Sequence, residues 1–199
     1  MFPILSSLII LPLIGSLFLL FIKSSEKNTS LKYVALFITF ANFCLSLYLW
    51  KIFNPLVTTF QFIENRIWIE GFINYKVGID GISILFVILT TFITPLCVIS
   101  VNSTITHRLK EFLIAILIME TLMIGVFCSL DLVIFYLFFE GGLIPMFLII
   151  GIWGGNRRVY SAFKFFLYTL LGSVLMLVAI ISIYWITGTT DVEKLYELG

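Results

Sequence analysis

Long apolar runs separated by short polar stretches form the dominant pattern of this chain. Six of these runs are long enough to cross a hydrocarbon core of about 30 Å as helices. They cover residues 2–22, 32–53, 81–101, 110–128, 132–153 and 159–187. The last run is longer than a perpendicular crossing needs, so we expect a tilted or over-long helix. The longest connection, 54–80, alternates apolar and polar residues in part, which predicts a short strand or an amphipathic surface segment.

Composition agrees with this pattern, because 61% of the 199 residues are hydrophobic and only 12% are charged. The sequence therefore predicts an all-α integral membrane protein with six transmembrane helices, and it excludes a soluble domain. A net charge of +1 gives no electrostatic reason to expect nucleic acid. Lipids and other membrane proteins are the expected partners.

Motifs for metal or cofactor binding are missing from the sequence. The three cysteines lie inside apolar runs, where we expect them to act as small buried hydrophobic residues. The cysteine and histidine spacing fits no disulfide or metal site, and no motif for nicotinamide, flavin or an iron–sulfur cluster occurs. We therefore expect no metal and no cofactor in this chain.

Loop charges predict the orientation in the membrane. Eight of the twelve lysine and arginine residues lie in the first, third and fifth connections, counted through Lys164. The positive-inside rule places these connections on the cytoplasmic or matrix side. The N-terminus, the connection at 54–80 and a polar tail at 188–199 are then expected on the outer side.

Glu140 is the one charge in the run from Leu132 to Trp153. A carboxylate at mid-membrane depth costs roughly 2.5–3.5 kcal/mol on insertion scales, so we interpret it as functional. Pro145 removes the helical partner of the Gly141 carbonyl, and Gly141 and Gly142 loosen the same turn. These residues predict a deformed helix beside the acid, where water or another polar group can replace the missing hydrogen bond.

Glu120 lies in the preceding run, and the short turn near Asp131 predicts that the two helices are antiparallel neighbours. Both glutamates are about ten residues, or about 15 Å, from this turn and so at the same depth. Two carboxylates at that depth would be suited to load and unload a proton. The alternative is that each is a single neutral acid bonded to local backbone, and the sequence leaves open whether they face each other.

Three further polar residues have a structural and a functional interpretation. Lys164 shares a helical face with Tyr168 and Gly172, and it either extends to the membrane interface or modulates a nearby acid. Asp80 precedes the run at 81–101 and is expected to cap that helix. His107 lies in a basic connection, where a solvated loop residue is favoured over a proton relay.

The run METLMIGVFCSLDLVIFYLFFEGGLIPMFLIIGIWG, Met119 to Gly154, resembles the M-type antiporter-like subunits, also called chain 4, of the respiratory NADH:quinone oxidoreductase, complex I. The segments FKFFLYTLLGSVLML and VGIDGIS resemble the same family. Its members have about fourteen membrane helices, including inverted repeats that form proton half-channels. The resemblance implies that residues 110–187 begin such a repeat, after three N-terminal helices within 1–109.

The resemblance also implies a role for Glu140, which falls on an essential glutamate of the family's fifth helix. That glutamate pairs with a lysine on the seventh helix, and Lys164 does not match that lysine's position. Electron transfer from NADH to quinone takes place in other subunits of the complex. The chain would therefore be a non-redox subunit of a proton-translocating enzyme.

The chain departs from the family pattern because it ends at Gly199, before the seventh helix. We expect a separate polypeptide to supply helices seven onward and complete the half-channel, beside other membrane subunits of complex I. Two other interpretations stay open: a subunit of a multisubunit sodium/proton antiporter, and a non-conducting assembly scaffold. The expected location is the mitochondrial inner membrane, with the bacterial plasma membrane as the alternative, and the N-terminus on the intermembrane-space or periplasmic side.

Overall fold

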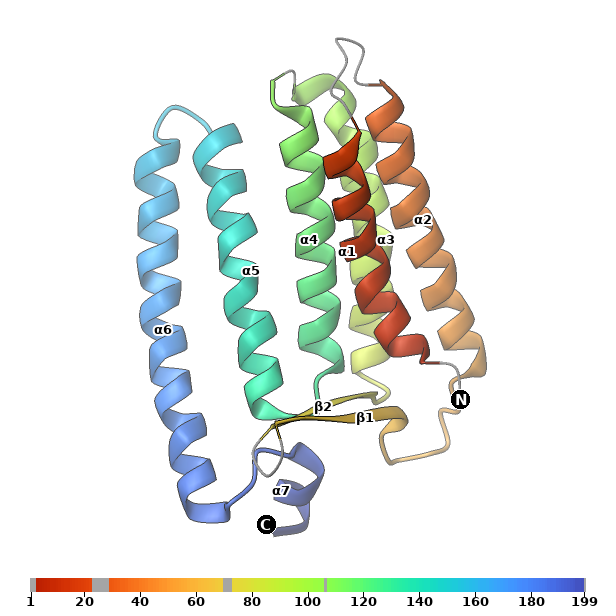
Figure 1. The fold of residues 1–199 in the computed structure, drawn as a ribbon, viewed down its shortest axis with the longest axis vertical. Coiled ribbons are helices and arrows are strands. Elements are labelled where there is room, and N and C mark those ends of the chain that lie inside the picture. The colour runs from red at the N-terminus through yellow and green to blue at the C-terminus, as the bar shows by residue number, and fades with distance from the viewer. Residues whose placement is uncertain (1–2, 23–28, 70–72, 106, 199) are drawn as a thin grey trace.

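The computed structural model describes residues 3–22, 29–69, 73–105 and 107–198. Within these ranges the chain forms six long helices, a two-stranded hairpin and a short last helix (Figure 1). In order they are α1 (Ile4–Phe21), α2 (Thr29–Ile52), β1 (Gln61–Ile69), β2 (Ile73–Ile79), α3 (Ser83–Thr104), α4 (Leu109–Cys128), α5 (Leu132–Trp153), α6 (Arg158–Thr187) and α7 (Val192–Leu198).

The six long helices confirm the six predicted membrane spans, because each is long and apolar enough to cross a bilayer. Helices α1 to α4 form one group, α5 packs against α4, and α6 lies on the far side of α5 (Figure 1). Two clusters of buried apolar side chains fill the space among α1 to α4. The outward faces are also apolar, which suits helices surrounded by lipid.

The connection predicted as a strand or an amphipathic segment is an antiparallel β-hairpin below the helices (Figure 1). Such a hairpin is marginally stable by itself in water. Here its inner side chains, Val77 and Ile79, are fully buried and join the apolar cluster that includes Leu5 and Ile84. The hairpin is therefore part of the folded core and not a free loop.

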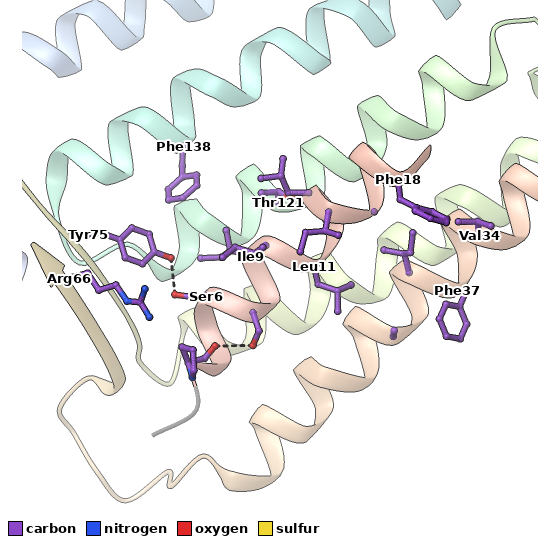
Figure 2. A pocket seen from close by; sticks show the side chains of 18 of the residues that line it. Ser6, Ile9, Leu11, Phe18, Val34, Phe37, Arg66, Tyr75, Thr121 and Phe138 are labelled. Atoms are coloured by element: carbon purple, nitrogen blue, oxygen red, sulfur yellow. Dashed lines mark hydrogen bonds between the residues drawn. The ribbon is translucent and has the colours of Figure 1, made fainter. Parts of the chain in front are cut away.

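The hairpin also supplies the cap at the start of α1. The Glu64 carboxylate accepts hydrogen bonds from the backbone N–H groups of Leu5 at 2.9 Å and Ser6 at 3.2 Å, and from the Ser6 hydroxyl. The Ser6 hydroxyl lies 3.2 Å from the Tyr75 hydroxyl (Figure 2). An anion at a helix start satisfies unpaired N–H groups and is favoured by the helix dipole.

The other end of α1 is held by a cation from α4. Lys110 Nζ donates to the carbonyl oxygens of Leu20 at 2.7 Å and Ile22 at 2.8 Å. Positive charge is favoured at the end of a helix, where carbonyl groups lack partners. Thus α1 is fixed at both ends by charged side chains that come from other parts of the chain.

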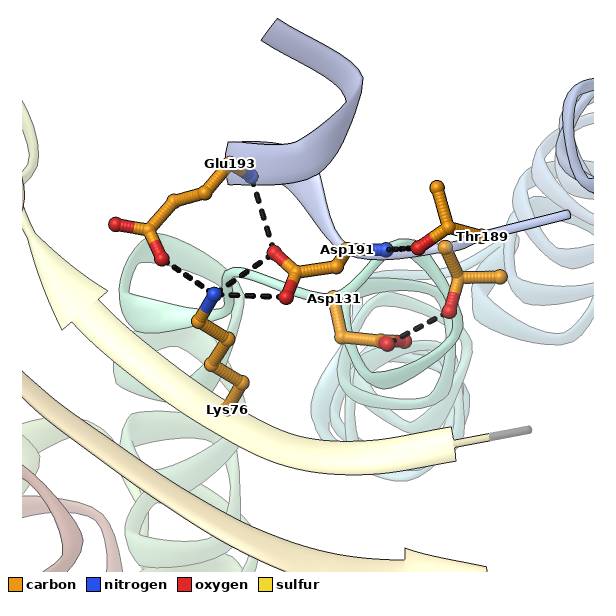
Figure 3. A network of polar contacts seen from close by, with 6 residues as sticks. Lys76, Asp131, Thr189, Asp191 and Glu193 are labelled. Carbon is orange, nitrogen blue, oxygen red and sulfur yellow. Dashed lines mark hydrogen bonds and ion pairs between the residues drawn. The ribbon is translucent and has the colours of Figure 1, made fainter. Parts of the chain in front are cut away.

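The described part of the segment expected as a polar tail, residues 188–198, docks onto the hairpin (Figure 3). Lys76 of β2 is only 7% exposed and donates to both carboxylate oxygens of Asp191, at 2.9 and 2.7 Å. Lys76 also forms an ion pair with Glu193, and we call these three residues the Lys76 network. Beside them, the Thr190 hydroxyl donates to Asp131 at 2.7 Å. The tail is thus tied both to the hairpin and to the turn between α4 and α5.

Candidate functional site

The turn between α4 and α5 sets the depth of the two candidate acids. Asp131 ends this turn, and its Oδ1 accepts from the N–H groups of Val133 at 2.9 Å and Ile134 at 3.3 Å, which caps α5. Glu120 lies eight residues before the end of α4, and Glu140 lies eight residues after the start of α5. At about 1.5 Å per residue, both are about 12 Å from the turn, so they share one depth.

The two acids do not face each other. Helix α4 meets α5 through Leu122 and Gly125: a Cβ on Gly141 would lie 3.1 Å from Leu122, and a Cβ on Gly125 would lie 2.5 Å from a Phe138 ring. At about 100° per residue, Leu122 and Gly125 lie about 200° and 140° around α4 from Glu120. Glu120 therefore points away from α5, toward the interior of the α1–α4 group.

Glu120 instead pairs with a polar residue of α2. Asn42 Nδ2 donates to Glu120 Oε1 at 2.8 Å, and the two residues are 0% and 2% exposed. Among the described residues, Asn42 Oδ1 and Glu120 Oε2 are both buried without a hydrogen-bond partner. Thr39 and Ser46 are buried on the same face of α2, and the Ser46 and Thr91 hydroxyls lie 2.7 Å apart. Glu120 thus belongs to a polar interior formed by α2, α3 and α4.

Glu140 lies on the face of α5 that packs against α6. Phe147 and Gly151, seven and eleven residues further along, share this face. The Phe147 ring lies 5.4 Å from the Phe163 ring of α6, and a Cβ on Gly151 would lie 3.6 Å from Ala162 Cβ. Glu140 Oε2 is buried and has no hydrogen-bond partner within the described chain. The acid therefore lies beside the α5–α6 contact with one oxygen unpaired.

Ser173 of α6 lies opposite Glu140 in this antiparallel contact. Gly151 of α5 lies against Ala162 of α6. Glu140 is eleven residues before Gly151, and Ser173 is eleven residues after Ala162, so the two lie at the same level of the antiparallel pair. Ser173 is 2% exposed, and its hydroxyl donates to the Leu170 carbonyl at 2.9 Å. Neither Ser173 nor Asn42 was predicted from the sequence as a site residue. The available signal was a small polar residue inside an otherwise apolar run.

The backbone near Glu140 is an unbroken α-helix from Leu132 to Trp153 that includes Pro145. Pro145 is buried, and Gly141 allows close contact with Leu122, whereas a Cβ on Gly142 would meet nothing within 4 Å. The deformation that we expected around these residues is thus not an unwound segment. Membrane helices accommodate proline because one missing hydrogen bond does not end the helix.

Lys164 does not approach either glutamate in the described chain. It is exposed on α6, and its Nζ lies 5.9 Å from the centre of the Tyr160 ring. This is a cation–π distance, within one turn of the same helix. Each of the ion pairs among the described residues involves other cations.

Asp80 and His107 lie near the two ends of α3. Asp80 Oδ1 accepts from the Ser83 N–H at 2.7 Å, which is the geometry of a cap. Burial alone raises the pKa of Asp80, but hydrogen bonds, those from Ser83 foremost, outweigh burial and lower it. His107 is exposed, and its backbone carbonyl accepts from Trp153 Nε1 at 3.1 Å. Within the described ranges, no group of three or more His, Cys, Asp or Glu residues could hold a metal ion.

Comparisons with known proteins identify relatives of this fold and sequence. Residues 129–198 match the family described as "NADH:quinone oxidoreductase/Mrp antiporter, TM". The chain is 58% identical over 172 residues to NADH-quinone oxidoreductase subunit M of Rhodobacter capsulatus, covering 86% of this chain and 33% of that protein. It is 48% identical over 193 residues to NADH-ubiquinone oxidoreductase chain 4 of Marchantia polymorpha, covering 96% and 39%.

A solved structure shows the same arrangement of helices. A chain of respiratory complex I from Thermus thermophilus with bound NADH matches with a TM-score of 0.79 and 27% identity. The match covers 96% of this chain and 38% of that one. The 199 residues therefore span between about a third and two fifths of the relatives that they match.

Proposed function

Because the chain belongs to this family of antiporter-like membrane subunits, we propose that it forms part of a proton-translocating subunit of NADH:quinone oxidoreductase, complex I. In this proposal Glu140 carries the proton. The observation that supports it is the buried and unpaired Oε2 of Glu140 at the middle of α5. An ionisable group at that depth is costly and is expected to serve a function.

The proposed chemistry is proton uptake and release controlled by a nearby cation. A cation close to a carboxylate favours its charged form, and withdrawal of the cation favours proton uptake. Lys164 is poorly suited to this role because it is exposed and lies over Tyr160. We propose that the cation comes from membrane helices outside these 199 residues.

The experiment that tests the role of Glu140 is the substitution Glu140→Gln, which keeps the shape and removes the exchangeable charge. We expect coupled proton pumping to be lost or sharply reduced while the helices still insert. The matched control is Glu111→Gln, an exposed glutamate in the first turn of α4. The readout is acidification of membrane vesicles, with NADH:quinone electron transfer measured in parallel. Full pumping by Glu140→Gln would refute the role and would favour the scaffold interpretation.

The source of this cation is tested with a photoreactive side chain at Ile144, which is 63% exposed on α5. We expect a cross-link to a membrane polypeptide with lysines inside its helices. Cross-links to lipid alone would contradict the proposal. We also propose that the chain lies in the mitochondrial inner membrane with its N-terminus in the intermembrane space.

A sodium/proton antiporter subunit is the second candidate, because the matching family description also includes Mrp antiporters. The two candidates differ in their partners. Redox subunits that bind NADH co-purify with the chain if it belongs to complex I, and they are missing if it belongs to an antiporter. The identities of 58% and 48% to proteins named as NADH oxidoreductase subunits favour complex I.

A further inference from the structure

A groove of about 1210 Å³ follows the outer side of α1, between α2 and the hairpin (Figure 2). This volume exceeds the roughly 300–1,000 Å³ of pockets for small ligands. The walls along the helices are almost entirely apolar, with Ile14 and Phe18 on α1 and Phe37 and Ala41 on α2. Ile14 is 60% exposed and Phe37 is 74% exposed. The groove therefore presents an apolar surface to the membrane.

The polar side chains of the groove gather at its hairpin end. Arg66 and Tyr75 extend from the hairpin toward Ser6 at the start of α1 (Figure 2). Arg66 is exposed and has no ion-pair partner within the described parts of the chain. The adjacent carboxylate, Glu64, is already occupied by the start of α1. The Arg66 guanidinium is thus the group at this end that is available to an anionic group.

The length of the groove corresponds to one leaflet of a bilayer. From Ser6 to Phe18 there are twelve residues of α1, which at about 1.5 Å per residue extend about 18 Å. Half of a hydrocarbon core of about 30 Å is about 15 Å. An occupant must therefore be apolar over the depth of one leaflet and anionic at the membrane surface.

We propose that this groove binds one glycerophospholipid from the leaflet on the hairpin side, with its phosphate at Arg66. The guanidinium group donates to phosphate oxygens with a geometry that suits two parallel hydrogen bonds. The acyl chains lie along the apolar walls of α1 and α2. The site is separate from Glu140 on α5 and does not depend on the role proposed for that residue.

The test is native mass spectrometry of the chain in the assembly with which it is extracted from the membrane. The protein is stripped of lipid and titrated with dioleoyl phosphatidylglycerol, or with dioleoylglycerol, which has the same acyl chains and no phosphate. We expect one tightly held phospholipid per chain and weaker binding of the diacylglycerol. Arg66→Gln should lower phospholipid affinity about tenfold, the size of one lost charge-assisted hydrogen bond. The matched control is Arg157→Gln, which removes an exposed arginine from the opposite end of the helices.

A second pair of variants tests the acyl-chain part of the site. Ala41→Trp fills the groove and should displace the phospholipid, whereas Leu47→Trp adds the same side chain to α2 outside the groove and should not. Circular dichroism confirms that each variant is folded. Equal lipid retention by Arg66→Gln and Arg157→Gln, or equal binding of both lipids, would overturn the proposal. A photoreactive group at Ile14 that captures a polypeptide in place of lipid would do the same.

Discussion

Removing the Lys76 ammonium group should release the last helix from the hairpin. Lys76→Met keeps the apolar stem and deletes the charge that pairs with Asp191 and Glu193. Hydrogen bonds to charged groups are worth about 1.5–3 kcal/mol each. The Glu193 side chain is 31% exposed, so water partly replaces that contact. We therefore expect the free energy of opening this contact to fall by about 2 kcal/mol in Lys76→Met, which corresponds to about a 30-fold shift of the local equilibrium toward the open form.

Hydrogen exchange measures this opening directly. The Val192 N–H donates to the Leu130 carbonyl, and the Leu132 N–H donates to the Thr190 carbonyl, both at 2.9 Å. Exchange at these two amides should accelerate about 30-fold in Lys76→Met if they open with the network. Lys194→Met is the matched control, because Lys194 is exposed on α7. Equal exchange rates in the two variants would refute the reasoning.

The pH dependence of this network has a definite sign. Burial alone lowers the pKa of Lys76, but hydrogen bonds and charges of Asp191 and Glu193 outweigh burial and raise it above 10.5. A raised pKa contributes stability that is fully present below the unfolded value and is lost as the pH rises through the folded value. The difference between wild type and Lys76→Met in protection of these two amides from hydrogen exchange should therefore stay constant between about pH 7 and 9. A decline within this window would contradict the assignment.

Three other substitutions test the cap of α3 and the surroundings of Glu120, each by denaturant titration of the purified protein. Asp80→Ala should lower the free energy of unfolding by about 1 kcal/mol, because α3 loses its cap. The pKa of Asp80 is lowered from 3.8 in the folded protein. The difference in stability between wild type and variant should therefore be present above pH 3.8 and vanish as the pH falls through the folded pKa. Gly125→Ala forces the Phe138 ring to move and should cost about 1–3 kcal/mol. Asn42→Leu leaves the Glu120 carboxyl without its partner on α2 and should lower the free energy of unfolding by about 1–3 kcal/mol. An unchanged denaturation midpoint in any of the three variants would contradict the contact proposed for that residue.

The six helices could be predicted from the sequence because the membrane requirement is local. A span needs an apolar run of fixed length with its backbone hydrogen bonds satisfied internally, and both properties are visible in a short window. The prediction for residues 132–153 has the same limits as α5, and that for 110–128 differs from α4 by one residue. The shared depth of Glu120 and Glu140 follows from the same local arithmetic.

The facing of the acids could not be predicted, because it depends on how each helix is rotated against its neighbours. From the sequence alone, the side-chain direction of Glu120 stays open. Its partner, Asn42, is 78 residues away in the sequence, and a single asparagine in an apolar helix does not indicate which helix it meets. The close contact of Gly125 with Phe138 turns Glu120 away from α5. Small residues that let two helices approach thus determine the environment of a charge on the opposite face.

The docking of the polar tail onto the hairpin could not be predicted for a related reason, because the sequence of a short charged segment does not show its distant partner. Asp191 meets Lys76 across 115 positions, and Glu64 meets α1 across almost 60. Both contacts join the hairpin to a helix or tail end. Water is available at these ends, so charged side chains can be used there at a modest cost.

These end contacts also bear on Glu140. Helix α6 packs chiefly against α5, and its buried residues are Ala162, Ser173 and Ile180. Few buried side chains give a helix little resistance to sliding or rotating along its neighbour. Immediately after α6, however, the chain is tied to Asp131 through Thr190 and to the hairpin through the Lys76 network. Because Asp131 also caps α5, one cluster fixes the adjacent ends of both helices. The position of Ser173 opposite Glu140 therefore rests on contacts at the membrane surface as well as on packing within the membrane.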